Sequence, residues 1–248
     1  MKIGNPGVIG FYMTFMQTLH QTLGWCSPVW AVTHAGHCVP PDTMDVIDGT
    51  YSNCWTVKLN GRMKHKLVFL SEHIPRDTYL VLMGHSVSCY IILEMLTLDP
   101  ELQVVKSVML FPTIERMAVT PQGRLLTPVL CHLHLCSLPA LITSPIKLHL
   151  NLILCCGTES VDTRHNLSSL LKEEIKYLCF GKGTCDHWYH VQYHQETKRD
   201  FPNGDIRLCS RGIRHALVLD TGKEVADMIH YDICANHCQC SFVLTKLN

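Results

Sequence analysis

The chain has 248 residues, which is enough for one well-buried domain, and 47% of its residues are hydrophobic while only 17% are charged. Its 21 basic residues balance its 21 acidic residues, so the chain lacks the charge excess of a nucleic-acid-binding protein, and we expect no nucleic-acid partner. Residues 1–12 hold no apolar run of signal-peptide length, which predicts that the protein is not secreted.

The first part of the chain alternates helical and extended patterns. Apolar residues at helical spacing predict a helix over 8–24, and the apolar run PVWAVTH predicts a buried strand over 28–34. Residues 35–55 are rich in Gly, Pro, Asp and Asn and are typical of a loop. Helical spacing then returns over 58–74.

The most informative stretch is TYLVLMGHSVSCYIILEML, which predicts a strand over 79–84, an abrupt Gly-His-Ser turn and an apolar helix over 86–98. Further elements follow along the chain: strands over 103–112, 175–183 and 205–210, and helices near 187–200 and 222–233. Strands that alternate with helices predict a mostly parallel sheet covered by helices on both faces. We therefore expect an α/β protein with a single domain over residues 1–248.

Residues 125–146 form an unusual segment, because none of these 22 positions holds Asp, Glu, Lys or Arg. The segment is long enough to span a bilayer, but it contains three prolines, which interrupt a helix, and two histidines, which are unfavourable in hydrocarbon. The alternatives to a transmembrane helix are a buried cap over a pocket and a segment that lies on a lipid surface. We expect residues 113–175 to form a cap or lipid-surface insertion within the domain.

The 14 cysteines are scattered through apolar stretches, as expected of small buried side chains that stay reduced in the cytosol. One cluster, Cys234, His237, Cys238 and Cys240, contains the thiol and imidazole groups that bind zinc in other proteins. Its spacing is tighter than that of familiar zinc modules, so we predict no metal site and no cofactor.

The stretch Gly84-His85-Ser86-Val87-Ser88 is similar to the Gly-x-Ser-x-Gly pattern of a nucleophile elbow. In that elbow a tight turn between strand and helix lifts the serine oxygen clear of the sheet, within reach of a histidine and of a substrate carbonyl. Gly84 permits a close approach of the backbone, whereas Ser88 replaces the second glycine and adds bulk where the helix meets the strand. The alternative is that Ser86 merely caps the helix. The strand and the helix on either side favour the elbow.

A serine nucleophile of this kind needs an acid and a histidine, in the chain order Ser, Asp, His. Asp186 and His215 each follow a predicted strand, at the places where the acid and the histidine belong in such a fold. Two other carboxylates are rival acids, but Asp205 opens a strand and Asp162 lies in an irregular stretch. We predict Ser86, Asp186 and His215 as the catalytic residues.

The negative charge that develops on a substrate oxygen requires backbone N–H donors fixed beside it. One donor is expected at Val87, directly after the nucleophile. The second is expected from the loop Gly4-Asn5-Pro6-Gly7, in which Pro6 has no N–H, so that Asn5 is the predicted donor. A plain turn is the alternative for this loop.

Several longer strings resemble the lipid droplet-associated hydrolase family of vertebrates. They are GNPG with the following FY, PVW, HAGH, GHS, LFPTIERM, DFPNGDIRLC, RHA and ADMI, over most of residues 4–130 and 183–232. The resemblance implies an α/β-hydrolase fold and a triad that maps by position onto Ser86, Asp186 and His215. It also implies a serine esterase that cleaves lipid carboxylic esters, cholesteryl esters among them, on the cytosolic side of lipid droplets and of the endoplasmic reticulum membrane.

The chain also departs from this family. Relatives carry additional chain before the glycine-rich loop, so we expect a sheet that lacks its N-terminal strands and has an exposed strand edge. Residues 131–182 diverge, and CDHWYH stands where relatives have a turn that contains proline. Two functions remain open: a lipid esterase, and a catalytically weak or inactive lipid-droplet surface protein that retains the hydrolase scaffold.

Overall fold

The computed structural model describes residues 9–32, 59–86, 88–114, 124–125, 177–182, 191–215, 217–234 and 241–245. These segments form a six-stranded sheet in the order β1-β6-β2-β3-β4-β5, and every neighbouring pair of strands is parallel. The strands are β1 (Val29–Val32), β2 (Leu80–His85), β3 (Val104–Leu110), β4 (Tyr177–Lys182), β5 (Asp205–Cys209) and β6 (Ser241–Thr245). Because all strands run the same way, their carboxyl ends meet at one end of the sheet, where α/β proteins place their functional groups.

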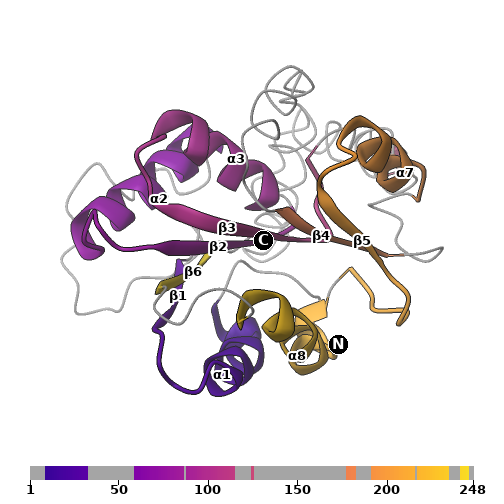
Figure 1. Cartoon of the computed structure of the whole chain (residues 1–248), viewed down its shortest axis with the longest axis horizontal. Helices are drawn as coiled ribbons and strands as arrows, with labels where there is room; N and C mark the ends of the chain where they lie inside the picture. Colours follow the sequence, from indigo (N-terminus) through magenta and orange to yellow (C-terminus); the bar gives the residue numbers. More distant parts are fainter. Residues whose placement is uncertain are drawn as a thin grey trace, which may run out of the picture.

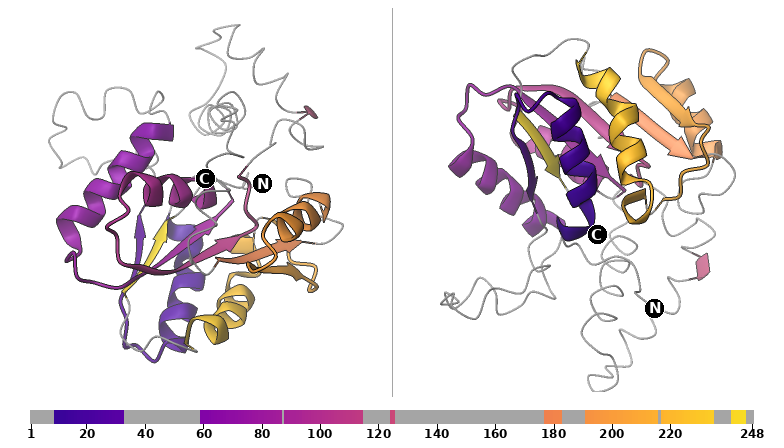
Figure 2. Two further views of the ribbon diagram at one scale, coloured as in Figure 1. Left: turned by 45° about the horizontal axis from the view of Figure 1, so that its top comes forward. Right: turned by 90° about the horizontal axis from the view of Figure 1, so that it is seen from below.

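Helices cover both faces of the sheet (Figure 1). One face carries α2 (Leu59–His73), α3 (Ser88–Leu98) and α7 (Val191–Asp200), and the other carries α1 (Met13–Thr22) and α8 (Gly222–Cys234). The view from below in Figure 2 shows α1 and α8 on the same face, where they contact each other directly. Two 3-10 helices, η1 (Ile9–Tyr12) and η4 (Leu217–Leu219), precede α1 and α8.

The sequence of β2 explains why the centre of the sheet is buried on both faces. Leu80 and Leu82 belong to the apolar cluster under α2 and α3, whereas Val81 and Met83 belong to the cluster under α1 and α8. This division follows from the alternation of side chains along a strand. All residues of β2 are buried, and α3 is buried along most of its length, so packing on both sides fixes the strand, the turn and the helix.

The predicted α/β architecture is confirmed, and the predicted helices and strands agree with the observed ones to within a few residues wherever the structure describes them. The strand β6 is not among the predicted elements. It lies between β1 and β2, with Val243 opposite both Trp30 and Leu82. The position beside β2 is thus filled by β6, which comes last among the described strands in chain order. β1 forms one edge of the described sheet.

Some predictions fall outside the described residues. They are the loop over 35–55, most of the insertion over 113–175, and the cysteines and histidine that follow Cys234. Leu125, which opens the uncharged segment, is 70% exposed. Among the helices that the structure describes, none is long and apolar enough to cross a membrane. The described residues also contain no group of three or more His, Cys, Asp or Glu that would hold a metal ion.

Candidate active site

Ser86 follows β2 directly and has a left-handed backbone conformation, with φ at 60°. A residue with a Cβ atom adopts this conformation at a cost of about 1–3 kcal/mol, so it persists only where the surrounding structure imposes it. Here the chain must reverse from β2 into α3, which begins at Ser88. The turn places Ser86 at the carboxyl end of a central strand, as the elbow pattern predicts.

Gly84 allows α3 to return close against β2. A Cβ atom at this position would lie 2.9 Å from backbone atoms of Ser88 and Cys89 and 2.9 Å from the side chain of Ile92. Such contacts are too short for real carbon atoms, so a larger residue would force α3 away from the strand. This close packing explains the first glycine of the pattern.

Ser88 stands at the position of the second glycine. Its side chain is 0% exposed, and its hydroxyl has no hydrogen-bond partner among the residues that the structure describes. A buried hydroxyl without a partner costs about 1–3 kcal/mol. The departure from glycine is therefore accommodated sterically, but with an unpaired polar atom in the core.

Backbone hydrogen bonds connect the elbow to the neighbouring strand. The Ser86 amide donates to the carbonyl of Leu110 at 3.0 Å, and the Ser86 carbonyl accepts from the amides of Cys89 at 3.2 Å and Thr113 at 3.3 Å. The Ser86 amide is thus engaged with the end of β3. An oxyanion at this site must find its donors in other amides.

His215 reaches Ser86 from the loop after β5. Its Nε2 lies 2.9 Å from Ser86 Oγ, and the side chain of His215 is half-buried. With Nε2 unprotonated, the serine hydroxyl donates to the imidazole, and this is the geometry in which a histidine takes the proton of a nucleophile. The structure therefore brings together two of the three residues that the sequence predicts as a triad.

Among the described residues, Thr113 and Phe111 also lie beside the serine–histidine pair, and both follow β3. Thr113 Oγ1 lies 3.1 Å from Ser86 Oγ. When the Ser86 hydroxyl donates to His215, the Thr113 hydroxyl is the donor in this second contact. Phe111 also has a left-handed backbone, with φ at 48°, and its ring centroid lies 6.1 Å from that of His215. The string Phe-Pro-Thr, placed where the strand beside the elbow ends, is the signal that could have found both.

His85, inside the elbow, contacts two distant parts of the chain. Its Nδ1 lies 2.8 Å from the hydroxyl of Tyr12, and its Nε2 lies 2.7 Å from the backbone oxygen of His215. Tyr12 and His85 are both buried. Burial raises the pKa of Tyr12 far above its usual value, with a smaller contribution from Cys89, so this side chain remains a neutral phenol.

The other predicted site residues, Asp186, Val87 and Asn5, lie outside the described residues, and their roles remain predictions. The rival acid Asp205 opens β5 and is paired with Arg207, whose Nε lies 2.7 Å from Asp205 Oδ1. This carboxylate is at the opposite end of the parallel sheet from His215, and that position excludes it as the partner of the imidazole.

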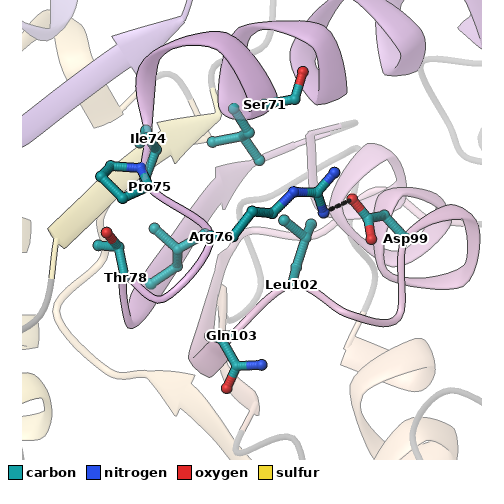
Figure 3. A pocket seen from close by; sticks show the side chains of 10 residues that line it. Ser71, Ile74, Pro75, Arg76, Thr78, Asp99, Leu102 and Gln103 are labelled. Carbon is teal, nitrogen blue, oxygen red and sulfur yellow. Dashed lines mark hydrogen bonds and ion pairs between the residues drawn. The ribbon is translucent and has the colours of Figure 1, made fainter.

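A small cavity lies at this opposite end of the sheet as well (Figure 3). The end of α2 and the loops before β2 and β3 line it, and Arg76 Nη1 pairs beside it with Asp99 Oδ2 at 3.0 Å. Leu80, one of its lining residues, is the first residue of β2, whereas Ser86 follows the last. The cavity is therefore separate from the serine–histidine pair.

Comparisons with known proteins show the family and the fold of the chain. The chain is similar to the lipid droplet-associated hydrolases of Gallus gallus, with 42% identity over 91% of this chain and 81% of the relative, and of Homo sapiens, with 36% identity over the same shares. Among solved structures it is similar to a bromoperoxidase from Bacillus anthracis, with TM-score 0.54 and 13% identity over 93% of this chain and 90% of that one. A pyrethroid hydrolase gives TM-score 0.52 and 14% identity over 94% and 95%.

The structural neighbours show that the fold is that of the α/β-hydrolases. The sequence profile described as lipid-droplet associated hydrolase matches residues 2–156, more than half of the chain. The profile, together with the identity to curated relatives over nine-tenths of the chain, shows that this protein belongs to the lipid droplet-associated hydrolase family.

Proposed function

We propose that this protein is a serine hydrolase that cleaves carboxylic esters of lipids, cholesteryl esters among them. The observation that carries the proposal is the 2.9 Å contact between His215 Nε2 and Ser86 Oγ at a left-handed turn after a central strand. A left-handed turn alone, or a serine–histidine contact alone, also occurs in proteins that are not hydrolases. Together they present a serine oxygen and the base that activates it. Membership of a family of hydrolases supports the same conclusion.

The reaction follows from the positions of these two groups. Ser86 Oγ attacks the ester carbonyl carbon while its proton passes to His215 Nε2, and a tetrahedral intermediate forms. His215 then gives this proton to the alcohol oxygen, so that the alcohol leaves and an acyl group stays on Ser86. A water molecule, deprotonated by His215, attacks the acyl carbonyl and releases the fatty acid, and the serine recovers its proton.

The acid and the oxyanion donors are part of the proposal. Asp186 follows β4, which lies beside β5 in the parallel sheet, so the chain leaves β4 at the same end of the sheet as His215. We assign to Asp186 the role of orienting His215 and stabilising its charged form. Val87 and Asn5 supply the oxyanion donors, which agrees with the engagement of the Ser86 amide by Leu110.

The place of action in this proposal is a lipid surface. The names of the relatives associate those proteins with lipid droplets. In this chain the uncharged residues 125–146 are the segment whose composition suits contact with a droplet or with the endoplasmic reticulum membrane, on the cytosolic side. Such contact would bring the protein to water-insoluble esters.

A fluorophosphonate probe tests the chemistry, because it reacts covalently with a serine only when that serine is activated. We expect the wild-type protein to be labelled and Ser86→Ala to lose all labelling. The matched control is Ser71→Ala, which removes an exposed serine hydroxyl on α2 and should leave labelling unchanged. A folded wild-type protein that never reacts would contradict the proposal and favour the inactive surface protein that retains the scaffold.

A further inference from the structure

The side chain of His85 joins three parts of the molecule at the candidate active site. It lies between the glycine and the serine of the elbow and is only 5% exposed. Its two ring nitrogens contact Tyr12, at the start of α1, and the backbone of His215, after β5. The elbow, an N-terminal helix and the loop of the general base therefore meet at one imidazole.

The chemistry of its partners fixes the tautomer of this imidazole. A carbonyl oxygen accepts hydrogen bonds only, so the 2.7 Å contact with the His215 oxygen requires a proton on His85 Nε2. A second proton would place a charge inside the core, which burial disfavours. His85 Nδ1 is therefore a hydrogen-bond acceptor, and the Tyr12 hydroxyl donates to it at 2.8 Å. Tyr12 thus stabilises the one neutral form of His85 that can hold the His215 carbonyl.

His215, whose backbone oxygen His85 binds, is also the residue whose ring must stay within reach of Ser86. The loop over 210–215 has no regular hydrogen-bonding pattern, and its buried side chain Ile213 together with Leu217 packs in the cluster under α1 and α8. The apolar contacts fix the loop against the sheet, and the bond from His85 fixes the peptide group of His215 itself. A shift of about 1 Å in a catalytic group can lower a rate by about 100-fold, so such a restraint has consequences for the reaction.

We propose that His85 is a positioning residue for His215, and that Tyr12 locks His85 in the tautomer that this role requires. The proposal rests on the proposed function, because positioning matters to catalysis only if His215 is the general base. The chain holding the base is then tied to the residue next to the nucleophile. The imidazole of His85 thus restrains the distance between the base and the nucleophile.

Two amide substitutions separate this role from simple packing, since each keeps one of the two contacts. In His85→Gln the amide nitrogen takes the place of Nε2 and still donates to the His215 carbonyl. In His85→Asn the amide oxygen takes the place of Nδ1 and still accepts from Tyr12, but the donor to His215 is lost. Hydrolysis of a soluble short-chain ester should show kcat near the wild-type value for His85→Gln and lower by about 10- to 100-fold for His85→Asn, with KM little changed in both.

Hydrogen exchange supplies a readout that does not depend on activity. Amides of residues 211–217 should exchange faster in His85→Asn than in wild type, and His85→Gln should resemble wild type. Equal exchange and equal kcat in the two variants would overturn the proposal, because loss of packing affects both alike. If the exchange pattern is as expected but no variant and no wild-type protein reacts with fluorophosphonate, the anchoring contact is supported and the proposed function is contradicted.

Discussion

At the residue scale, Ser88 is the clearest departure of the elbow from its pattern, and we expect it to affect the stability of the fold. Its hydroxyl is buried and has no partner among the described residues. Ser88→Ala removes this unpaired group and keeps the small volume, so we expect the free energy of unfolding to rise by about 1 kcal/mol. Urea unfolding followed by circular dichroism measures this change through the transition midpoint.

The control for this prediction is Ser71→Ala in α2, an exposed serine whose hydroxyl donates to the Val68 carbonyl at 2.8 Å. This control reports the gain in helix propensity that any serine-to-alanine change in a helix brings. Ser88→Ala should exceed it. A Ser88→Ala protein less stable than wild type would show that the hydroxyl makes a needed hydrogen bond.

Thr113 leads to a second prediction at this scale, concerning rate. Its Oγ1 lies 3.1 Å from Ser86 Oγ, and when the serine hydroxyl points to His215 the threonine donates this hydrogen bond and restricts the rotation of the nucleophile. Thr113→Val removes this donor and keeps the branched shape. We expect the fluorophosphonate labelling rate to fall by about 3- to 10-fold, in line with the loss of one neutral hydrogen bond. Thr113→Ser retains the hydroxyl and should label at nearly the wild-type rate; equal rates for Val and Ser would count against this role.

At the scale of elements, β6 shows the importance of a strand that the sequence pattern does not reveal. It pairs with both β1 and β2, so it is internal to the sheet. Val243→Pro would remove a ladder hydrogen bond between those strands. We expect the free energy of unfolding to fall by about 3 kcal/mol or more. Thermal unfolding should show a strongly lowered midpoint or no cooperative transition.

The comparison for this variant is Val29→Pro, at the first residue of the edge strand β1, where proline is better tolerated. Val29→Pro should be clearly more stable than Val243→Pro. The reverse order would mean that β6 is not held between β1 and β2.

The uncharged segment 125–146 supports a prediction about localisation. Deleting these residues should lower the fraction of the protein that co-fractionates with lipid droplets, because the deletion removes 22 consecutive positions without charged side chains. Ser86→Ala, which changes the site and leaves the segment intact, should associate with droplets like the wild type. Undiminished association of the deletion variant would assign droplet binding to another part of the chain.

Some features of the fold and of the site can be predicted from the sequence, and others cannot. Strands and helices with strong local patterns, such as β2 and α3, are predicted to within a few residues, and so are the positions of Ser86 after β2 and of His215 after β5. Local patterns do not reveal which strands pair. The insertion of β6 beside β2, and the approach of Tyr12 and Thr113 to the elbow, are contacts between distant segments, and no periodicity records them.

At the scale of the whole molecule, pH acts on stability through a buried histidine. His194 on α7 is 7% exposed, and its Nδ1 has no partner among the described residues. Burial, and to a lesser degree the charge of Lys198, lowers the pKa of His194 below its usual value. Below the usual histidine pKa the unfolded chain takes up a proton that the folded protein resists, so stability falls as pH drops from neutral into the acid range.

Urea midpoints at pH 7.5 and pH 5.5 measure this dependence. The wild-type protein should lose stability over this interval, and His194→Leu should lose less, because it has no imidazole to protonate in the unfolded state. Replacement of the exposed His73 in the same way is the control, and it separates the effect of burial from that of losing an imidazole. If His194→Leu lost as much stability as the wild type between the two pH values, His194 would not be the cause of the pH dependence.

The position of β6 also sets an order on the folding of the newly made chain. β2 and β3 leave the ribosome well before β6, which is the partner on the other side of β2, has been made. Until β6 arrives, β2 exposes an unpaired apolar edge, which is prone to pair with other chains. Contacts this distant in sequence also form slowly. We therefore expect the nascent protein to depend on chaperones until β6 has been made, and ribosome-bound chains that stop before residue 241 to aggregate once released.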